Sequence, residues 1–279
     1  MKMLDLLKAI LFGIVEGITE WLPVSSTGHM ILLDEFVKMN VSEEFWNLFL
    51  VVIQLGAILA VVILFWDKIF PFDFSKEARA EHRVNRKDVW LLWVKILISC
   101  VPAAIIGVLF DDVFDRLFYN GPCVAIALIV FGIAFIAIET SKKGKEFKVN
   151  SISEITYKTA LYIGFFQVLA AIFPGTSRSG ATIVGALLIG VARTVAAEYT
   201  FYLAIPVMAG ASLLKVLKFD GSMTGSEFMI LLVGTVVAFA VSIVVIRFLM
   251  GYIRKHDFKV FGVYRIILGL VVLIYFGMR

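Results

Sequence analysis

A short polar stretch near the N-terminus, residues 16–29, carries side chains that could do chemistry within an otherwise apolar sequence. Glu16 and Glu20 are four residues apart, so a helix would place both carboxylates on one face. Two carboxylates placed in this way could hold a divalent cation or handle protons. His29 ends the stretch. Because polar groups are costly at membrane depth, the stretch is a candidate functional site.

A similar pattern returns about 150 residues later, in residues 167–182. Gln167 corresponds to Glu16, and after one inserted residue the run Ser177-Arg178-Ser179-Gly180 corresponds to Ser25-Ser26-Thr27-Gly28. Because polar residues are costly within a membrane segment, a polar cluster that occurs twice indicates a functional site. The sequence therefore predicts one site that is assembled from two related pieces.

Arg178 is the strongest single candidate, because its guanidinium has the fork geometry that suits phosphate oxygens. Helices that begin after the two breaks, at 25–29 and 177–182, would point backbone N–H groups into a shared cavity and favour an anion, above all phosphate. Gln54 lies in a predicted span and would either brace a hairpin or bind the ligand. The other residues expected to bind substrate are Ser25, Thr27, Gly175, Thr176, Ser177, Ser179 and Thr182.

Composition identifies an integral membrane protein. Of the 279 residues, 61% are hydrophobic and 17% are charged, and the mean hydropathy is +0.95; soluble domains are nearer one quarter charged. The net charge of +4 comes from basic loops, so no nucleic-acid partner is expected. Cys100 and Cys123 lie in or beside apolar runs and are expected to be free thiols.

Two segments, 4–38 and 159–191, are apolar runs that are interrupted at Pro23 and Pro174. A spanning helix needs about 20 apolar residues, and the limb after each proline is too short. We therefore expect two re-entrant hairpins, each surrounded by protein or lining a wet cavity. Gly13 and Gly17, in the first limb, have a spacing that is typical of close helix packing.

Three predicted spans follow each hairpin, so the expected fold is an all-α polytopic membrane protein made of two repeats. Three is an odd number, so the second repeat must be inverted relative to the first. The first repeat, 1–140, contains the hairpin and spans 45–66, 89–110 and 121–139; the second, 151–279, contains its hairpin and spans 196–217, 228–250 and 260–277.

Loop charge indicates the orientation independently. The loops that contain Arg83, Lys145 and Lys255 carry six, four and three Lys or Arg residues, whereas the two opposite turns carry only Arg116 and Lys218. Positive loops stay in the cytoplasm. We therefore expect these three loops to be cytoplasmic and both termini to face outward.

The motifs make the chain similar to the undecaprenyl pyrophosphate phosphatase family, also called the bacitracin-resistance proteins. The glutamate-rich motif appears as Glu16-Gly-Ile-Thr-Glu20, and the Pro-Gly-x-Ser-Arg-Ser motif as Pro174-Gly-Thr-Ser-Arg178-Ser179. The run Leu-Pro-Val-Ser-Ser-Thr-Gly-His is unbroken at 22–29, and residues 197–206 also fit the family pattern. The resemblance covers essentially the whole chain.

The resemblance implies an enzyme that hydrolyses undecaprenyl diphosphate, a polyprenyl diphosphate lipid, to the monophosphate and so recycles the lipid carrier for peptidoglycan. It implies a multi-pass protein of the bacterial cell membrane, surrounded by membrane lipids, with its active site toward the outer face. It also implies a divalent cation, Mg²⁺ or Ca²⁺. The functional residues that it carries over are Glu16, Glu20, Ser26, His29 and Arg178.

The sequence leaves three points open: the attacking group, an alternative function as a transporter, and the oligomeric state. The attacking group is Ser26 deprotonated by His29, which we favour, or His29 itself, or water. Inverted repeats with broken helices are also typical of secondary transporters, so a lipid-phosphate flippase is the alternative function. Whether the chain forms a homodimer is also open.

Overall fold

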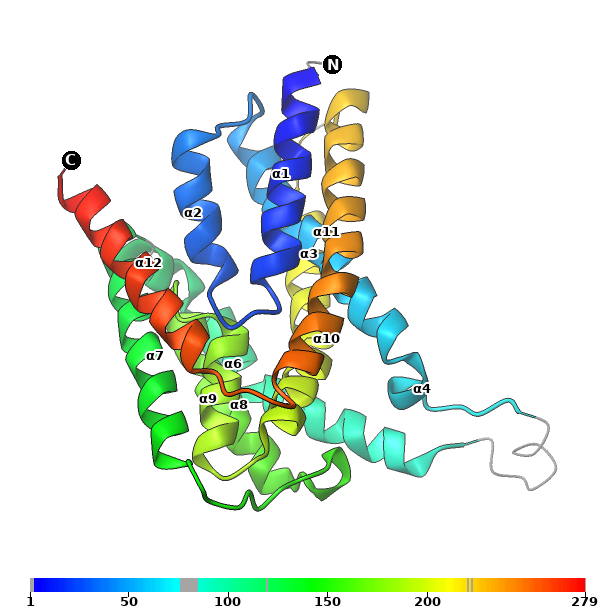
Figure 1. The fold of residues 1–279 in the computed structure, drawn as a ribbon. Helices are drawn as coiled ribbons and strands as arrows, with labels where there is room; N and C mark the ends of the chain where they lie inside the picture. Colours follow the sequence, from blue (N-terminus) through cyan, green and yellow to red (C-terminus); the bar gives the residue numbers. More distant parts are fainter. Residues whose placement is uncertain (1–2, 76–84, 119, 220, 222, 279) are drawn as a thin grey trace.

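The computed structural model describes residues 3–75, 85–118, 120–219, 221 and 223–278, which fold almost entirely into helices (Figure 1). Within this part of the chain no strand is formed, and the only β contacts are two isolated bridges, Phe72 with Asn85 and Val149 with Val191. The all-α fold class is confirmed.

Six helices in the described residues are long and apolar enough to cross a membrane. They begin and end within a few residues of the predicted spans. The exception is α6, which continues to Phe118 because residues 111–118 contain neither glycine nor proline. The six are α3 (Glu43–Leu64), α6 (Lys87–Phe118), α7 (Gly121–Ser141), α10 (Arg193–Leu217), α11 (Gly225–Tyr252) and α12 (Lys259–Gly277).

Two pairs of shorter helices form the predicted hairpins. In each pair the return helix has 11 residues, about 16 Å at 1.5 Å per residue, which is well short of a hydrocarbon core of about 30 Å. Two single turns, α4 (Trp66–Ile69) and η1 (Ile152–Glu154), complete the described helices. The first hairpin is α1 (Met3–Thr19) with α2 (Ser26–Phe36), and the second is α8 (Tyr157–Ile172) with α9 (Arg178–Leu188).

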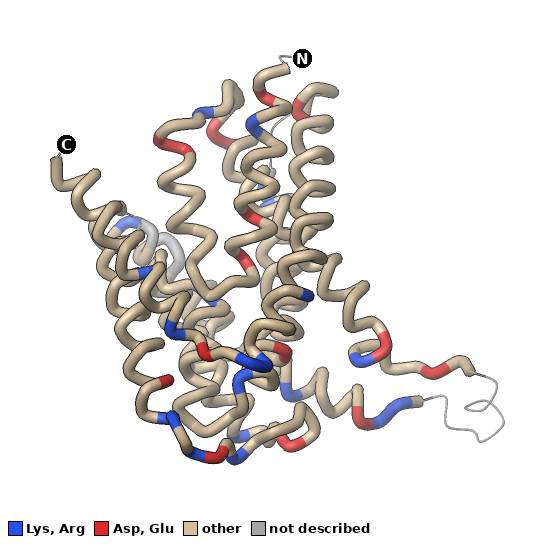
Figure 2. The backbone as a smooth tube through the Cα atoms, viewed as in Figure 1, with Lys and Arg blue, Asp and Glu red and all other residues tan. Residues whose placement is uncertain are grey.

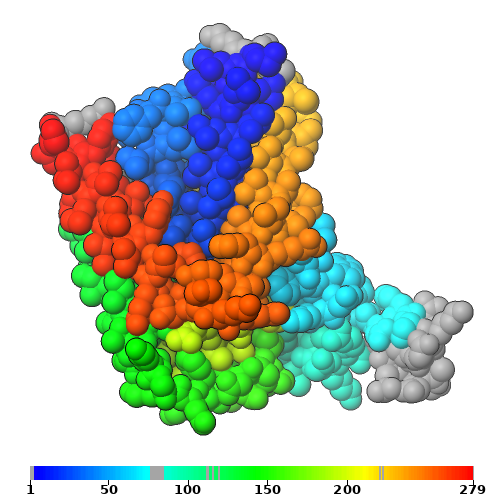
Figure 3. Space-filling view, in the orientation of Figure 1, coloured from blue at the N-terminus to red at the C-terminus, as the bar shows by residue number. Residues whose placement is uncertain are grey.

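Each hairpin packs against long helices. Helix α1 lies along α11, α8 lies along α6, and α7 lies along α12. Figure 3 shows α1 and α2, in blue, between α12 in red and α11 in orange. A Cβ on Gly13 would lie 2.6 Å from the carbonyl oxygen of Gly234, and one on Gly17 would lie 2.8 Å from that of Ala238. The predicted close packing of these glycines is confirmed.

The two hairpins occupy opposite ends of the molecule. Figure 1 places α1 and α2 in the upper half and α8 and α9 in the lower half. Figure 2 shows most Lys and Arg residues at the lower end, including those in the loops from α7 to α8 and from α11 to α12. Lys145 and Lys255, in these loops, are exposed, whereas Arg83 lies outside the described residues. The division into two inverted repeats stays a prediction.

Candidate active site

The two helix breaks have the same backbone conformation. Ser25 and Ser177 are the only non-glycine residues of the described chain with positive φ, at 74° and 70°. Each is the N-cap of its return helix, and each Oγ accepts a hydrogen bond from the N–H of a glycine three residues on, Gly28 or Gly180, at 3.3 and 3.1 Å. Positive φ costs a serine about 1–3 kcal/mol and is concentrated at functional sites.

The breaks meet through Glu20 and Arg178. Arg178 Nη2 donates to Glu20 Oε1 at 3.0 Å, and Arg178 Nη1 donates to the carbonyl oxygen of Thr200 in α10 at 3.0 Å. Ser179 Oγ donates to the carbonyl oxygen of Glu20 at 3.2 Å. The Arg178 and Glu20 side chains are only 12% and 9% exposed, so their attraction is less weakened by water than that of a surface pair.

Glu16 lies one helical turn before Glu20, and the N–H of Glu20 donates to the carbonyl oxygen of Glu16 at 3.0 Å. The predicted spacing therefore holds, although α1 ends at Thr19. Glu16 is 1% exposed, and its Oε1 has no hydrogen-bond partner within the described structure. Its sequence counterpart, Gln167, is also buried with both amide atoms unpartnered.

These two carboxylates suit a divalent cation. An orphaned buried carboxylate oxygen is costly, and a cation would satisfy it. Among the described residues no group of three or more His, Cys, Asp or Glu side chains gathers around a common point. A cation there would therefore complete its coordination with water or ligand oxygens, as Mg²⁺ usually does.

Among the described residues no hydrogen bond joins Ser26 to His29, so the favoured pairing of the two stays a prediction. Ser26 Oγ instead donates to Glu20 Oε2 at 2.7 Å. His29 Nδ1 lies 2.7 Å from the carbonyl oxygen of Ser25, which can only accept, so this nitrogen carries a proton. His29 Nε2 lies 2.7 Å from Tyr264 Oη, and the two rings stack at 5.7 Å between centroids. Both ring nitrogens of His29 are thus occupied away from Ser26.

The remaining predicted binding residues are distributed unevenly. Ser177 Oγ and Ser179 Oγ lie 3.1 Å apart. Thr182 Oγ1 donates to the carbonyl oxygen of Arg178 at 2.9 Å and lies 2.9 Å from Thr200 Oγ1, so it supports the start of α9.

Gly175 has a φ of 93° and approaches α7 so closely that a Cβ would lie 2.6 Å from the carbonyl oxygen of Val124. Thr176 is fully buried, and its Oγ1 has no partner in the described structure. Thr27, in the first turn of α2, and Gln54 are half-buried, and within the described part of the chain neither side chain forms a hydrogen bond to the breaks.

Two residues of α12 were missed by the sequence analysis. Tyr264 holds His29, as described above, and Arg265 hydrogen-bonds to both breaks. Arg265 is 0% exposed; its guanidinium donates to the carbonyl oxygens of Pro23 and Thr176 at 3.2 and 2.7 Å. An arginine inside an apolar span is itself a signal of function, and the predicted span 260–277 contained it.

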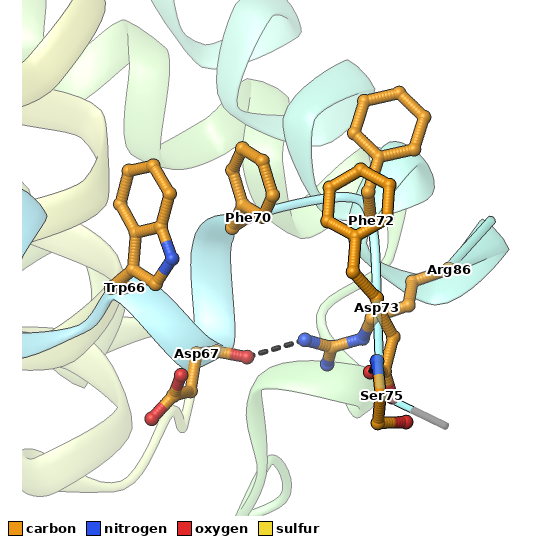
Figure 4. A pocket seen from close by; sticks show the side chains of 8 residues that line it. Trp66, Asp67, Phe70, Phe72, Asp73, Ser75 and Arg86 are labelled. Carbon is orange, nitrogen blue, oxygen red and sulfur yellow. Dashed lines mark hydrogen bonds between the residues drawn. The ribbon is translucent and has the colours of Figure 1, made fainter. Parts of the chain in front are cut away.

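Other polar groups lie apart from the breaks. Glu198 accepts from Lys68 Nζ at 2.8 Å and from Tyr202 Oη at 2.5 Å, so it braces α4 against α10. A hollow of about 350 Å³ lies beside α4 and is lined by aromatic and polar side chains in equal number, with Arg86 donating to the carbonyl oxygen of Asp67 (Figure 4). None of the predicted site residues lines this hollow.

Together these features define a class: a multi-pass helical membrane protein whose two helix breaks join an acid pair, hydroxyls and an arginine into one buried polar site. The family described as "Bacitracin resistance protein BacA" matches residues 9–271. The chain belongs to this family.

Named relatives are similar over the whole length. The chain is 62% identical to the undecaprenyl-diphosphatase of Desulfitobacterium hafniense, over 100% of this chain and 99% of the relative. It is 62% identical to undecaprenyl-diphosphatase 1 of Clostridium acetobutylicum, over 99% of both chains. An undecaprenyl-diphosphatase of Enterococcus faecalis is 56% identical over 97% of both. These names indicate phosphatases and give the flippase alternative no support.

Proposed function

We propose that the chain is an undecaprenyl-diphosphatase, a membrane enzyme that hydrolyses undecaprenyl diphosphate to undecaprenyl phosphate and inorganic phosphate. The observation that carries the proposal is the contact of Arg178 with Glu20, which joins two helix starts in one buried polar site. The names of the full-length relatives agree with it. The product would return to use as the lipid carrier of cell-wall synthesis.

Arg178 is suited to hold the terminal phosphoryl group. A guanidinium has five N–H donors, and those not used by Glu20 and Thr200 remain for phosphate oxygens. The first turn of α9 adds backbone N–H groups, since the first N–H groups of a helix have no partner within it. Phosphoryl transfer depends mainly on such positioning and charge neutralisation.

Glu16 and Glu20 would hold the divalent cation, Mg²⁺ or Ca²⁺. When bound, such a cation neutralises charge on the diphosphate oxygens. The support for this assignment is the buried, unpartnered Oε1 of Glu16 one helical turn from Glu20.

Ser26 is our preferred nucleophile, with Glu20 in place of His29 as the proton acceptor. The Ser26 hydroxyl already donates to Glu20 Oε2. In the proposed step Ser26 Oγ bonds to the terminal phosphorus, its proton moves to Glu20, and the bridging P–O bond breaks to release undecaprenyl phosphate. Water then hydrolyses the phosphoserine to inorganic phosphate. His29 would orient the start of α2 through its contact with Tyr264.

The protein would lie in the bacterial cell membrane with its active site toward the outer face. The basic loops at the lower end of Figure 2 would then face the cytoplasm, in line with the positive-inside rule. The polyprenyl tail would lie between helices in the lipid.

Phosphate release tests the proposal. Purified protein in detergent is incubated with undecaprenyl diphosphate and Mg²⁺, and inorganic phosphate is measured over many turnovers. We expect release without a second compartment, because hydrolysis needs no gradient. Arg193→Lys is a matched control, since Arg193 pairs with Glu139 of α7 and, among the described residues, forms no hydrogen bond or ion pair with a site residue. Binding of the lipid without any release would overturn the proposal.

A further inference from the structure

Arg265 is a fully buried cation without a buried counter-ion. It lies in the apolar helix α12 and is 0% exposed. Among the described residues no carboxylate forms an ion pair with it. Burying a charge without such a partner costs free energy, and hydrogen bonds must offset this cost. A residue kept at such a cost is a candidate for a functional role.

The hydrogen bonds of Arg265 go to backbone carbonyls of both breaks. Nη1 donates to Pro23 in the first break at 3.2 Å, and Nη2 donates to Gly175 and Thr176 in the second at 2.9 and 2.7 Å. Nε points at the carbonyl oxygen of Leu128 in α7 at the longer distance of 3.5 Å. One planar group therefore ties together two loops that are some 150 residues apart in the sequence.

The contact with Thr176 fixes the direction of a neighbouring donor. A peptide unit is planar and trans, so its C=O and N–H point in opposite directions. Because the Thr176 carbonyl points toward Arg265, the N–H of Ser177 points away from it. Ser177 is the N-cap of α9, directly before Arg178. Arg265 thus sets the orientation of the backbone from which the Arg178 side chain and the first N–H groups of α9 project.

We propose that Arg265 is a positioning residue for the hydrolysis: it locks the two breaks so that Glu20 and Ser26 of one hairpin stay in register with Arg178 of the other. This inference rests on the proposed function. Arg265 acts through the backbone and does not touch the substrate, since its N–H groups are directed at carbonyls inside the protein.

Arg193 provides the comparison that separates positioning from ordinary stabilisation. It also joins distant helices, because its guanidinium donates to both oxygens of the fully buried Glu139 in α7 at 2.6 to 2.9 Å. Among the described residues, no hydrogen bond of this pair goes to either break. Arg193→Lys should therefore lower stability without changing the chemistry of the folded protein.

The test compares Arg265→Lys with Arg193→Lys and the wild type. Lysine keeps the charge but cannot bridge both breaks with one planar fork. We expect kcat per folded protein to fall about 100-fold in Arg265→Lys, as for a small misplacement of reacting groups, with KM changed by far less. Amide hydrogen exchange should rise in both segments, 20–28 and 174–180. Arg193→Lys should change neither kcat nor exchange in these segments.

A second variant keeps the test valid if Arg265→Lys does not fold. A Cβ on Gly180 would lie 2.9 Å from Arg265 Nη1, so Gly180→Ala should displace the guanidinium and lower kcat. Gly210→Ala is the control, because a Cβ there meets nothing within 4 Å. Wild-type kcat in both Arg265→Lys and Gly180→Ala, or unchanged exchange in both breaks, would overturn the inference. Absence of phosphate release by the wild type would instead overturn the proposed function. The hydrogen-exchange measurement would still test whether Arg265 holds the two breaks in place.

Discussion

Glu20 Oε1 and Arg178 Nη2 lie 3.0 Å apart, although the two residues are 158 positions apart in the sequence. Glu20 begins the first break, and Arg178 begins the helix after the second. The contact therefore turns two separate hairpins into one site. The Ser26 hydroxyl donates to the other carboxylate oxygen of Glu20. The Glu20 carboxylate therefore connects Arg178 with Ser26.

The acid pair leads to a prediction about cation dependence. Glu16→Gln should raise the Mg²⁺ concentration for half-maximal phosphate release by at least about tenfold, since altered cation sites lose affinity on this scale. The double variant with Glu20→Gln should lose the cation-dependent activity altogether. A Mg²⁺ titration at saturating lipid measures both effects.

Glu44→Gln is the matched control for this titration, because Glu44 is an exposed acid in the first turn of α3. It should behave as the wild type. An unchanged titration curve in the double variant would leave Glu16 and Glu20 without a role in cation binding.

The contacts of Ser26 lead to a prediction about the covalent intermediate. Phosphate trapped during turnover should survive acid, as a serine ester does, and should map to Ser26. Ser26→Ala should lose at least about 100-fold in kcat, the scale of losing one main catalytic group. His29→Ala should not be rescued by raised pH, because His29 is not the partner of Ser26 in this structure.

Acid quenching followed by peptide mapping makes this measurement, and recovery of activity between neutral and alkaline pH tests the base. Acid-labile phosphate on His29 would contradict the assignment and identify the histidine as nucleophile. Strong recovery of His29→Ala at raised pH would return His29 to the role of base.

Local sequence was enough to predict the helices and their breaks. Pro23 and Pro174 interrupt apolar runs, and a limb of 11 residues cannot cross a bilayer whatever its neighbours are. The four-residue spacing of Glu16 and Glu20 and the unusual position of Arg178 were equally visible, because each is a property of a short segment.

The partners of these residues were not predictable, because they depend on packing between helices far apart in the sequence. His29 is three residues after Ser26, yet its side chain contacts Tyr264 in α12, 235 positions away. Arg265 lies within the predicted span 260–277, and the mean hydropathy of such a span stays high when one of its residues is charged. A search for charged residues within spans would have found it.

Orientation gives a prediction that is independent of activity. Single cysteines at Lys145 and Lys255, in a background without Cys100 and Cys123, should resist an impermeant thiol reagent in intact cells. A cysteine at Glu44, exposed in the first turn of α3, should react, because the predicted topology places the start of this span on the outer side. The reason is the concentration of basic residues in the loops that contain Lys145 and Lys255. Labelling of the Lys145 position from outside would contradict the inverted-repeat topology.

The central claim is that one site is built across the two hairpins, and a double-mutant cycle on Glu20 and Arg178 tests it most directly. The measurement is kcat/KM for phosphate release from undecaprenyl diphosphate by the wild type, Glu20→Gln, Arg178→Lys and the double variant. We expect Arg178→Lys alone to lose about 100-fold or more, because a point charge cannot replace the fork. The double variant should be hardly worse than the poorer single variant, because residues that act as a unit are strongly non-additive. The account would be contradicted if the fold-loss of kcat/KM in the double variant equalled the product of the two single losses. Wild-type turnover in Arg178→Lys would also contradict it.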